Sequence, residues 1–302
     1  MTLGLALGSG GARGWCHIGV LQELEAMGIR PDVAAGCSMG ALVGAAWAGG
    51  RLDALADWAT ALTRSRVMRL LDVRLSGGGL VQGGAIAQII EEIGLPDDFS
   101  DLEKPFLAVA TDMTTGQEIW LREGSLCNAV RGSMAMPGVF APFRHEGRWL
   151  LDGGMVNPVP SSACRALGAD TTLAVNPNGA HDDKLWVPAE PSRSFWRFEG
   201  LKEWADILPE GLQKMLPEAR KDERPVPPDY LDVVSTSMDI MSRYLRQTRL
   251  ASDPPQILLE ADLRQTVLVL ELEKAGVAIE AGRELVRAQA DDIRAVCGDK
   301  GQ

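Results

Sequence analysis

Short apolar runs alternate with amphipathic segments through the first 175 residues of the chain. Continuous apolar runs predict buried strands, and apolar positions three or four residues apart predict helices that cover a sheet. Such alternation is typical of an α/β fold with a mostly parallel central sheet and, here, one hairpin. Strands are expected at 3–7, 33–35, 106–111, 117–121, 149–151 and 172–175, and helices at 15–27, 39–48, 53–63 and 85–93.

The chain changes character after Asn176. Residues 177–229 are rich in Pro and charged side chains with interspersed aromatics, which predicts a variable insertion or cap on a main domain at 3–176. Residues 230–302 predict a helical segment that packs on that same domain. Its expected elements are helices at 231–247 and 278–296 and a short strand at 257–259.

The overall composition excludes several classes of protein. Hydrophobic residues make up 46% of the chain and charged residues 24%, which indicates a folded core and not a disordered chain. The net charge of -11 opposes binding to nucleic acid and to anionic lipid head groups. Any contact with a membrane would therefore have to come from local apolar surface.

The five cysteines are scattered and form no C-x-x-C pair. This pattern indicates reduced thiols in the cytoplasm and argues against a zinc site or a disulfide framework. The apolar N-terminus lacks basic residues and is expected to be the first strand, not a signal peptide. Residues 33–50 carry no charge and hold two G-x-x-x-G steps, but they are mostly Ala and Gly. A buried strand, turn and helix is therefore expected there in preference to a membrane span.

A G-x-S-x-G pentapeptide at 36–40 joins an expected strand to an expected helix. Ser38 would sit on a sharp strand-to-helix turn, where its hydroxyl is exposed near helix N-terminal amides. Gly36 and Gly40 leave room for the tight backbone, and Cys37 is expected to point into the core. This geometry suits a nucleophile, and capping of the following helix is the competing structural interpretation.

A glycine-rich loop at 8–14 lies between the first strand and the first helix. It fails the dinucleotide-binding fingerprint because Arg13 stands where the third Gly belongs, and it lacks the Gly-Lys-Ser/Thr ending of a phosphate loop. Backbone N–H groups that converge at such a turn suit a negatively charged oxygen. The sequence therefore predicts an oxyanion hole at Gly10, Gly11, Ala12 and Arg13.

Asp152-Gly153-Gly154 follows the expected strand at 149–151. Asp-Gly pairs are frequent in ordinary turns, which is the structural interpretation. The functional interpretation is a base that the turn positions to take the proton of Ser38.

The three histidines offer few candidates for the histidine of a Ser-Asp-His triad. His17 is expected to be packed or capping in the first helix, and His145 to be exposed in a turn. His181 follows Asp152 but lies in a polar loop. A triad of Ser38, Asp152 and His181 on an α/β-hydrolase fold remains an alternative, although a nucleophile so near the N-terminus leaves few strands before it.

With these three motifs the chain resembles the patatin-like phospholipase family, whose hallmarks are a glycine-rich oxyanion loop, a G-x-S-x-G serine and a D-G-[GA] aspartate. The motifs occur here in the family's order. The similarity extends to the stretches at 17–21, 110–116, 133–138 and 157–160. The stretch at 253–258 is similar to the bacterial branch related to neuropathy target esterase. Ser9 departs from the family's usual Gly, which affects only the fine geometry of the loop.

The resemblance implies a three-layer α/β/α fold, a catalytic domain at 3–176 and a dyad of Ser38 and Asp152. It implies a serine hydrolase that cleaves carboxylic esters of phospholipids or lysophospholipids through an acyl-enzyme, with no metal and no cofactor. Arg13 matches the family's basic position and is expected to steady the loop or the oxyanion. The expected partners are lipid esters and no nucleic acid, in the cytoplasm, and peripheral membrane contact is left open.

The alternative from another class is an interaction or regulatory module that keeps this fold and has weak catalysis. Intact Ser38 and Asp152 argue against a loss of the chemistry.

Overall fold

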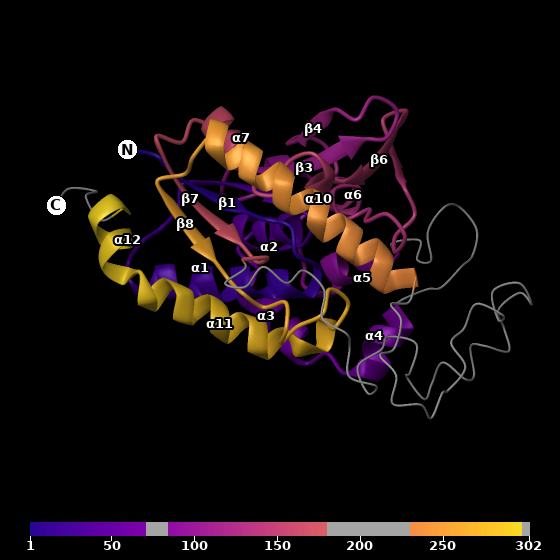
Figure 1. Ribbon diagram of the computed structural model, residues 1–302, viewed down its shortest axis with the longest axis horizontal. Coiled ribbons are helices and arrows are strands. Elements are labelled where there is room, and N and C mark those ends of the chain that lie inside the picture. Colours follow the sequence, from indigo (N-terminus) through magenta and orange to yellow (C-terminus); the bar gives the residue numbers. More distant parts are fainter. Residues whose placement is uncertain (71–83, 180–229, 298–302) are drawn as a thin grey trace, which may run out of the picture. The chain divides into compact units, whose positions relative to one another are not determined.

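The computed structural model describes residues 1–70, 84–179 and 230–297 (Figure 1). The chain divides into two units, Met1–Asp182 with Met241–Gln302, and Asp183–Ile240. In the second unit the described residues are 230–240, which form the first part of helix α10 (Tyr230–Ser252). The domain boundaries expected at 176 and 229 stay a prediction.

A central sheet runs through the first unit in the order β5-β6-β3-β2-β1-β7-β8, and β4 also pairs with β3. The pairs from β3 through β2, β1 and β7 to β8 are parallel, and those of β4, β5 and β6 are antiparallel. The prediction of a mostly parallel sheet is confirmed. The strands are β1 (Leu3–Leu7), β2 (Val33–Cys37), β3 (Phe106–Asp112), β4 (Glu118–Leu121), β5 (Phe143–His145), β6 (Arg148–Asp152), β7 (Thr171–Asn176) and β8 (Ile257–Glu260).

Strands β2 and β6 meet end to end along one edge of β3. β4 pairs with residues 108–111 of β3, and this segment overlaps the parts of β3 that pair with β2, 106–109, and with β6, 110–112. Because each edge of a strand pairs with one neighbour at a time, β4 takes one edge and β2 and β6 share the other. β2 therefore ends with Cys37, and β6 ends with Asp152, at adjacent positions of β3.

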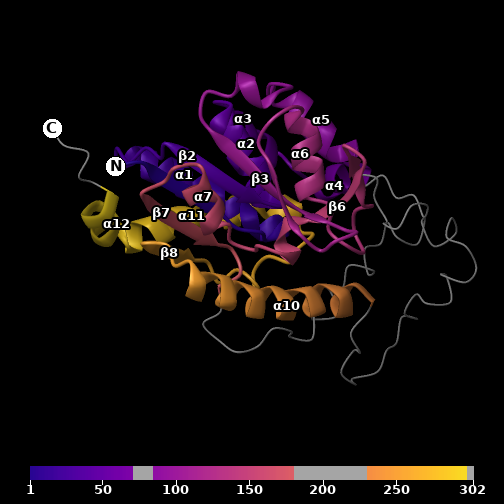
Figure 2. The ribbon, with the colours of Figure 1, turned by 90° about the horizontal axis from the view of Figure 1, so that it is seen from above.

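Helices cover both faces of the sheet because successive strand residues point to opposite sides. On one face Leu5, Leu7 and Phe106 pack with α1, α2, α6 and α11, and on the other Ala6 and Val109 pack with α7 and the end of α10 (Figure 2). This confirms the three-layer α/β/α arrangement. The remaining helices are α1 (Cys16–Ala26), α2 (Met39–Ala48), α3 (Leu52–Thr60), α4 (Arg64–Leu70), α5 (Gly84–Glu92), α6 (Leu126–Ser133), α7 (Ser161–Ala166), α11 (Ala275–Ala288) and α12 (Ala290–Cys297), with 3-10 turns at Gly11–Trp15, Phe99–Asp101, Gly153–Met155 and Leu272–Lys274.

Helix α11 runs alongside α1, far from it in sequence (Figure 1). A Cβ atom at Gly19 would lie 1.8 Å from the Ile279 carbonyl oxygen, and one at Gly282 would lie 2.0 Å from that of Cys16. The two glycines thus allow the helix backbones to touch. This contact places the C-terminal part of the chain directly against the helix that follows the glycine-rich loop.

Most expected strands and helices occur within a few residues of their predicted bounds. Residues 33–50 form β2, a turn and α2, as expected, and no helix in the described ranges combines the length and apolar character needed to cross a membrane. The prediction of one continuous helix at 278–296 is wrong, because the chain forms two helices there, α11 and α12, with a break at Gln289. The sequence did not predict α4, α6, α7 and β5, which are short. Most of the expected insertion, from 180 to 229, lies outside the described residues.

Candidate active site

Ser38 stands on a strained turn between β2 and α2. Its φ of 57° and ψ of -122° lie in a region that non-glycine residues seldom occupy. The flanking glycines explain how the chain turns so sharply. A Cβ atom at Gly36 would lie 2.2 Å from the Gly40 carbonyl oxygen, and one at Gly40 would lie 2.2 Å from that of Leu7. The interpretation of Ser38 as only a helix cap is not supported, since its side chain makes no capping hydrogen bond to α2.

The backbone of Ser38 is held from the end of helix α6. Its N–H donates to the Ser133 hydroxyl oxygen at 2.9 Å, and that hydroxyl donates to the Val109 carbonyl at 2.6 Å. Ser133 is fully buried. It was not singled out from the sequence, although it opens the stretch at 133–138 that resembles the family. The strained turn therefore rests on a buried side chain from a distant element.

Asp152 ends β6 and begins the 3-10 turn Gly153–Met155. Its side-chain Oδ1 accepts the Gly154 N–H at 2.8 Å. Its own N–H donates to the Ala135 carbonyl at 2.9 Å, and its carbonyl accepts the Thr111 hydroxyl at 2.8 Å. Asp152 is thus an Asp-Gly turn residue whose backbone and side chain are both held in place.

The Ser38 and Asp152 side chains meet at the junction of β2 and β6. The Ser38 hydroxyl lies beside the Asp152 carboxylate, and the Cys37 sulfur lies 4.0 Å from Oδ1. Burial raises the pKa of Asp152 from 3.8 to about 6, while the hydrogen bonds from Ser38 and Gly154 act to lower it. Burial, with the nearby Asp152 charge, raises the pKa of the Cys37 thiol well above its ordinary value. Cys37 is a buried core residue, as predicted.

The glycine-rich loop lies beside both of these residues. A Cβ atom at Gly14 would be 2.6 Å from the Met39 Cβ, immediately after Ser38. A Cβ atom at Gly154 would be 2.9 Å from the Ser9 hydroxyl oxygen. The structure therefore brings together the three motifs that the sequence placed far apart.

Two of the four amides predicted to form the oxyanion hole are engaged within the protein. The Ala12 N–H donates to the Val269 carbonyl at 2.8 Å, and the Arg13 N–H donates to the Gly10 carbonyl at 3.2 Å. The expectation that the Ala12 amide remains available to an oxyanion is wrong for this structure. The segment that carries Val269 lies on the loop, and its carbonyl satisfies an amide that the tight turn would otherwise leave buried.

Gly10 and Gly11 are the remaining amide donors of the predicted oxyanion hole. Within the described part of the chain, neither amide has a hydrogen-bond partner in the protein. Gly11 has a φ of +54°, and a Cβ atom there would lie 2.5 Å from the Val269 carbonyl oxygen, so this position requires glycine. The first turn of α2, beginning at Met39, adds helix N-terminal amides nearby.

The buried Arg13 side chain holds the loop. Its Nε donates to the Val267 carbonyl at 3.0 Å, and its Nη1 donates to Asn178 Oδ1 at 2.8 Å. Asn178 in turn donates to the Ser9 carbonyl at 2.9 Å. Of the two roles expected for Arg13, these contacts favour steadying the loop.

The described histidines lie in structural settings. His17 is fully buried and its Nε2 bonds the Gly8 carbonyl at 2.8 Å, so it is packed, as predicted. Burial lowers the pKa of His17 to about 4, and the ring is therefore neutral near pH 7. His145 is half-buried in β5 opposite Arg148, less exposed than expected. His181 lies outside the described residues, so the structure does not test the triad.

Within the described ranges, no group of three or more His, Cys, Asp or Glu side chains is arranged to hold a metal ion. The residues assembled here are a serine, a carboxylate and backbone amides. Chemically, this set can deliver a nucleophile, accept its proton and stabilise a negative oxygen.

Comparison with known proteins points to one family. The family model described as patatin-like phospholipase matches residues 5–164. An uncharacterized NTE family protein of Mycobacterium tuberculosis is 45% identical over 176 residues, which are 58% of this chain and 49% of that protein. Patatin-like phospholipase domain-containing protein 6 of Homo sapiens is 32% identical over 213 residues, 68% of this chain and 15% of that protein.

One more relative and one solved structure are similar to this chain. Neuropathy target esterase sws of Drosophila melanogaster is 31% identical over 202 residues, 65% of this chain and 14% of that protein. The crystal structure of VipD from Legionella pneumophila has a TM-score of 0.48 and 14% identity, covering 96% of this chain and 66% of that one. The chain spans about half the length of the mycobacterial relatives it matches and a smaller share of the animal proteins.

Proposed function

This chain belongs to the patatin-like phospholipase family and is similar to NTE family proteins, and we propose that it is a serine hydrolase that cleaves acyl esters of lipids. The proposed catalytic dyad is Ser38 and Asp152. The observation that carries the proposal is the strained Ser38 turn beside the buried Asp152 carboxylate. Nucleophile and base are therefore adjacent before substrate binds.

In the first step the Ser38 oxygen attacks the ester carbonyl and its proton passes to Asp152. A pKa of about 6 leaves most of the Asp152 carboxylate ionised at neutral pH, while making it a stronger base than an ordinary aspartate. The Gly10 and Gly11 amides, with the N-terminus of α2, would stabilise the negative oxygen of the tetrahedral intermediate. Collapse of this intermediate releases the alcohol, which takes the proton from Asp152, and leaves an acyl-Ser38.

In the second step water attacks the acyl-Ser38 ester. Asp152 takes a proton from this water, and the same amides stabilise the second tetrahedral intermediate. Its collapse frees the fatty acid and returns the proton to Ser38. Both steps use one base and no metal or cofactor.

The proposed substrates are esters of glycerophospholipids or lysophospholipids. The names of the animal relatives, a phospholipase domain protein and a neuropathy target esterase, support this class. The five cysteines are free, which supports a reducing, cytoplasmic location. Peripheral contact with a membrane belongs to the same proposal and is one arm of its test.

The test is a hydrolysis panel of short p-nitrophenyl esters, monomeric lysophospholipids and diacyl phospholipids in neutral or anionic vesicles. Each substrate is measured with the wild type, Ser38→Ala and, as a matched serine control, Ser100→Ala on the surface. We expect Ser38→Ala to lose about 10³-fold or more in kcat/KM and the control to match the wild type. Full activity of Ser38→Ala would contradict the proposal, and failure of Ser38 to react with a fluorophosphonate would favour an interaction module.

A further inference from the structure

Glu118 carries a mostly buried carboxylate beside the proposed active site. It lies on β4 opposite Thr111, and its side chain is 14% exposed. Its Oε1 accepts hydrogen bonds from Trp120 Nε1 at 2.7 Å and Asn157 Nδ2 at 2.9 Å. Its Oε2 lies 3.1 Å from Nη2 of Arg249, on α10. One carboxylate thus joins three segments of the chain.

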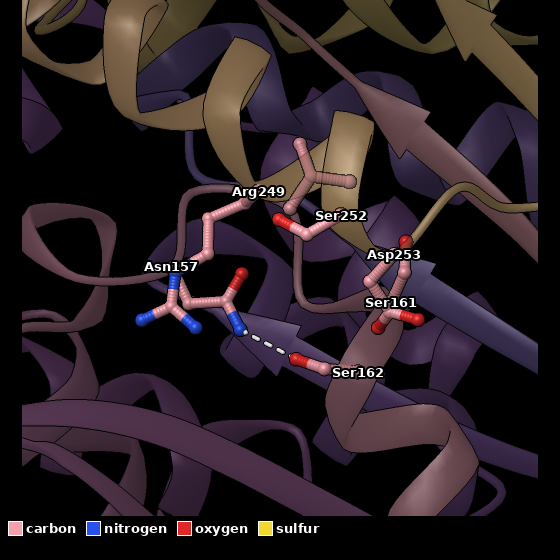
Figure 3. Close-up of a pocket in the computed structure, with 7 residues that line it drawn as sticks. Asn157, Ser161, Ser162, Arg249, Ser252 and Asp253 are labelled. Carbon is pink, nitrogen blue, oxygen red and sulfur yellow. Dashed lines mark hydrogen bonds between the residues drawn. The ribbon is translucent and has the colours of Figure 1, made fainter.

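Asn157 links the Glu118 carboxylate to the turn that follows Asp152. It is 1% exposed, and its backbone N–H donates to the Gly153 carbonyl at 2.8 Å. Its side chain also donates to the Ser162 hydroxyl at 3.1 Å (Figure 3). Because Gly153 directly follows Asp152, the Glu118 carboxylate helps to hold the turn that presents the proposed base.

Arg249, which pairs with Glu118, also lines a small pocket. The pocket has a volume of about 160 Å³ and lies between α7 and the end of α10 (Figure 3). An ion pair of Asp253 with Arg165 of α7 ties down the end of α10 next to it. The residues lining the pocket are Asn157, Val159, Ser161, Ser162, Arg249, Ser252 and Asp253.

We propose that Arg249 is a positioning residue for Asp152, acting through Glu118 and Asn157, an inference that rests on the proposed function. Arg249 supplies the positive charge that holds the mostly buried Glu118 carboxylate in place, with Oε1 turned toward Asn157. Without it the carboxylate rotates toward water, since an unpaired buried charge is costly. This rotation weakens the hydrogen bond from Asn157 and loosens the turn after Asp152.

The charge of Glu118 also reaches the neighbourhood of Ser38, because it contributes to the raised pKa of the Cys37 thiol. Arg249 therefore offsets a negative charge that acts on the residue directly before Ser38. Both effects bear on the chemical step more than on substrate binding.

The experiment measures kcat and KM for a p-nitrophenyl ester with Arg249→Gln, Arg249→Lys and the double variant Glu118→Gln/Arg249→Gln. The matched control is Arg294→Gln on α12, whose side chain is 59% exposed. We expect Arg249→Gln to lower kcat about tenfold with KM unchanged, because a misplaced base slows the chemical step. Arg249→Lys restores part of the loss, and the double variant loses less than Arg249→Gln because no unpaired carboxylate remains.

Thermal unfolding of each variant shows that it is folded at the assay temperature. Equal kcat in Arg249→Gln and wild type would overturn the positioning role. So would losses that are the same in Arg249→Gln and Arg249→Lys, or a change confined to KM. Failure of the proposed function itself gives a different result, namely wild-type hydrolysis that persists in Ser38→Ala.

Discussion

The Cys37 sulfur lies 4.0 Å from Oδ1 of Asp152, at the point where β2 and β6 meet along the same edge of β3. A parallel strand and an antiparallel strand thus deliver the nucleophile turn and the proposed base to adjacent positions of one neighbour. Backbone hydrogen bonds of the sheet set this separation, and such bonds are more rigid than contacts between loops. The closeness of Ser38 and Asp152 is therefore a property of the sheet.

The activity is expected to depend on pH through Asp152. The carboxylate must be ionised to accept the Ser38 proton, and burial raises its pKa to about 6. We therefore predict that kcat/KM rises with pH along an acid limb with an apparent pKa of about 6. Initial rates of p-nitrophenyl ester hydrolysis across this range measure it. An acid limb near the ordinary aspartate value of 3.8 would contradict the environment described for Asp152.

The same pKa shift predicts a stability cost that Asp152→Asn removes. The folded-state pKa of about 6 exceeds the ordinary 3.8, so folding favours the protonated form. Stabilisation from that form is full below about pH 4 and is lost as the pH rises through 6. We expect Asp152→Asn to raise the free energy of unfolding by roughly 1–3 kcal/mol above pH 7, and by much less near pH 4. Urea unfolding at both pH values tests this, and an equal difference at both would refute it.

Ser133→Ala is expected to impair catalysis from a distance. It removes the acceptor of the Ser38 N–H and leaves that buried group without its partner, at a cost of about 1–3 kcal/mol in stability. Because the strained turn loosens, kcat should fall about tenfold. The control is Ser125→Ala at the other end of α6, where the hydroxyl caps the helix. Its loss costs about 1 kcal/mol of stability and leaves kcat unchanged. Equal kcat in both variants would show that Ser133 has no part in holding the turn.

Gly40→Ala is expected to destabilise the whole domain. The added Cβ would lie 2.2 Å from the Leu7 carbonyl oxygen, so β1 and α2 would have to separate. We predict a loss of about 1–3 kcal/mol or more in the free energy of unfolding, measured by urea denaturation. Gly276→Ala in α11 is the matched control, since nothing lies within 4 Å of its Cβ and Ala favours a helix by up to about 1 kcal/mol. A Gly40→Ala protein as stable as the wild type would refute the close packing of the turn.

The local sequence was sufficient to predict the Ser38 turn, because glycines on either side of a serine between an apolar strand and a small-residue helix leave few alternatives. It also predicted the parallel core of the sheet from continuous apolar runs. The short elements α4, α6, α7 and β5 were missed because each is too brief to show a clear hydrophobic period.

The sequence could not show which distant groups complete the candidate site. The Ala12 amide is taken by Val269, more than 250 positions away, and Ser38 rests on Ser133 from another element. Likewise, the ion pair of Glu118 with Arg249 depends on where α10 ends relative to β4. Such contacts depend on tertiary packing and leave no pattern in the neighbouring residues.

The most direct test of the Ser-Asp dyad compares kcat/KM of Asp152→Asn with that of His181→Gln on the same p-nitrophenyl ester. We predict a loss of about 10³-fold or more for Asp152→Asn and a value within about twofold of wild type for His181→Gln. A collapse of activity in His181→Gln, or near wild-type activity in Asp152→Asn, would contradict the dyad.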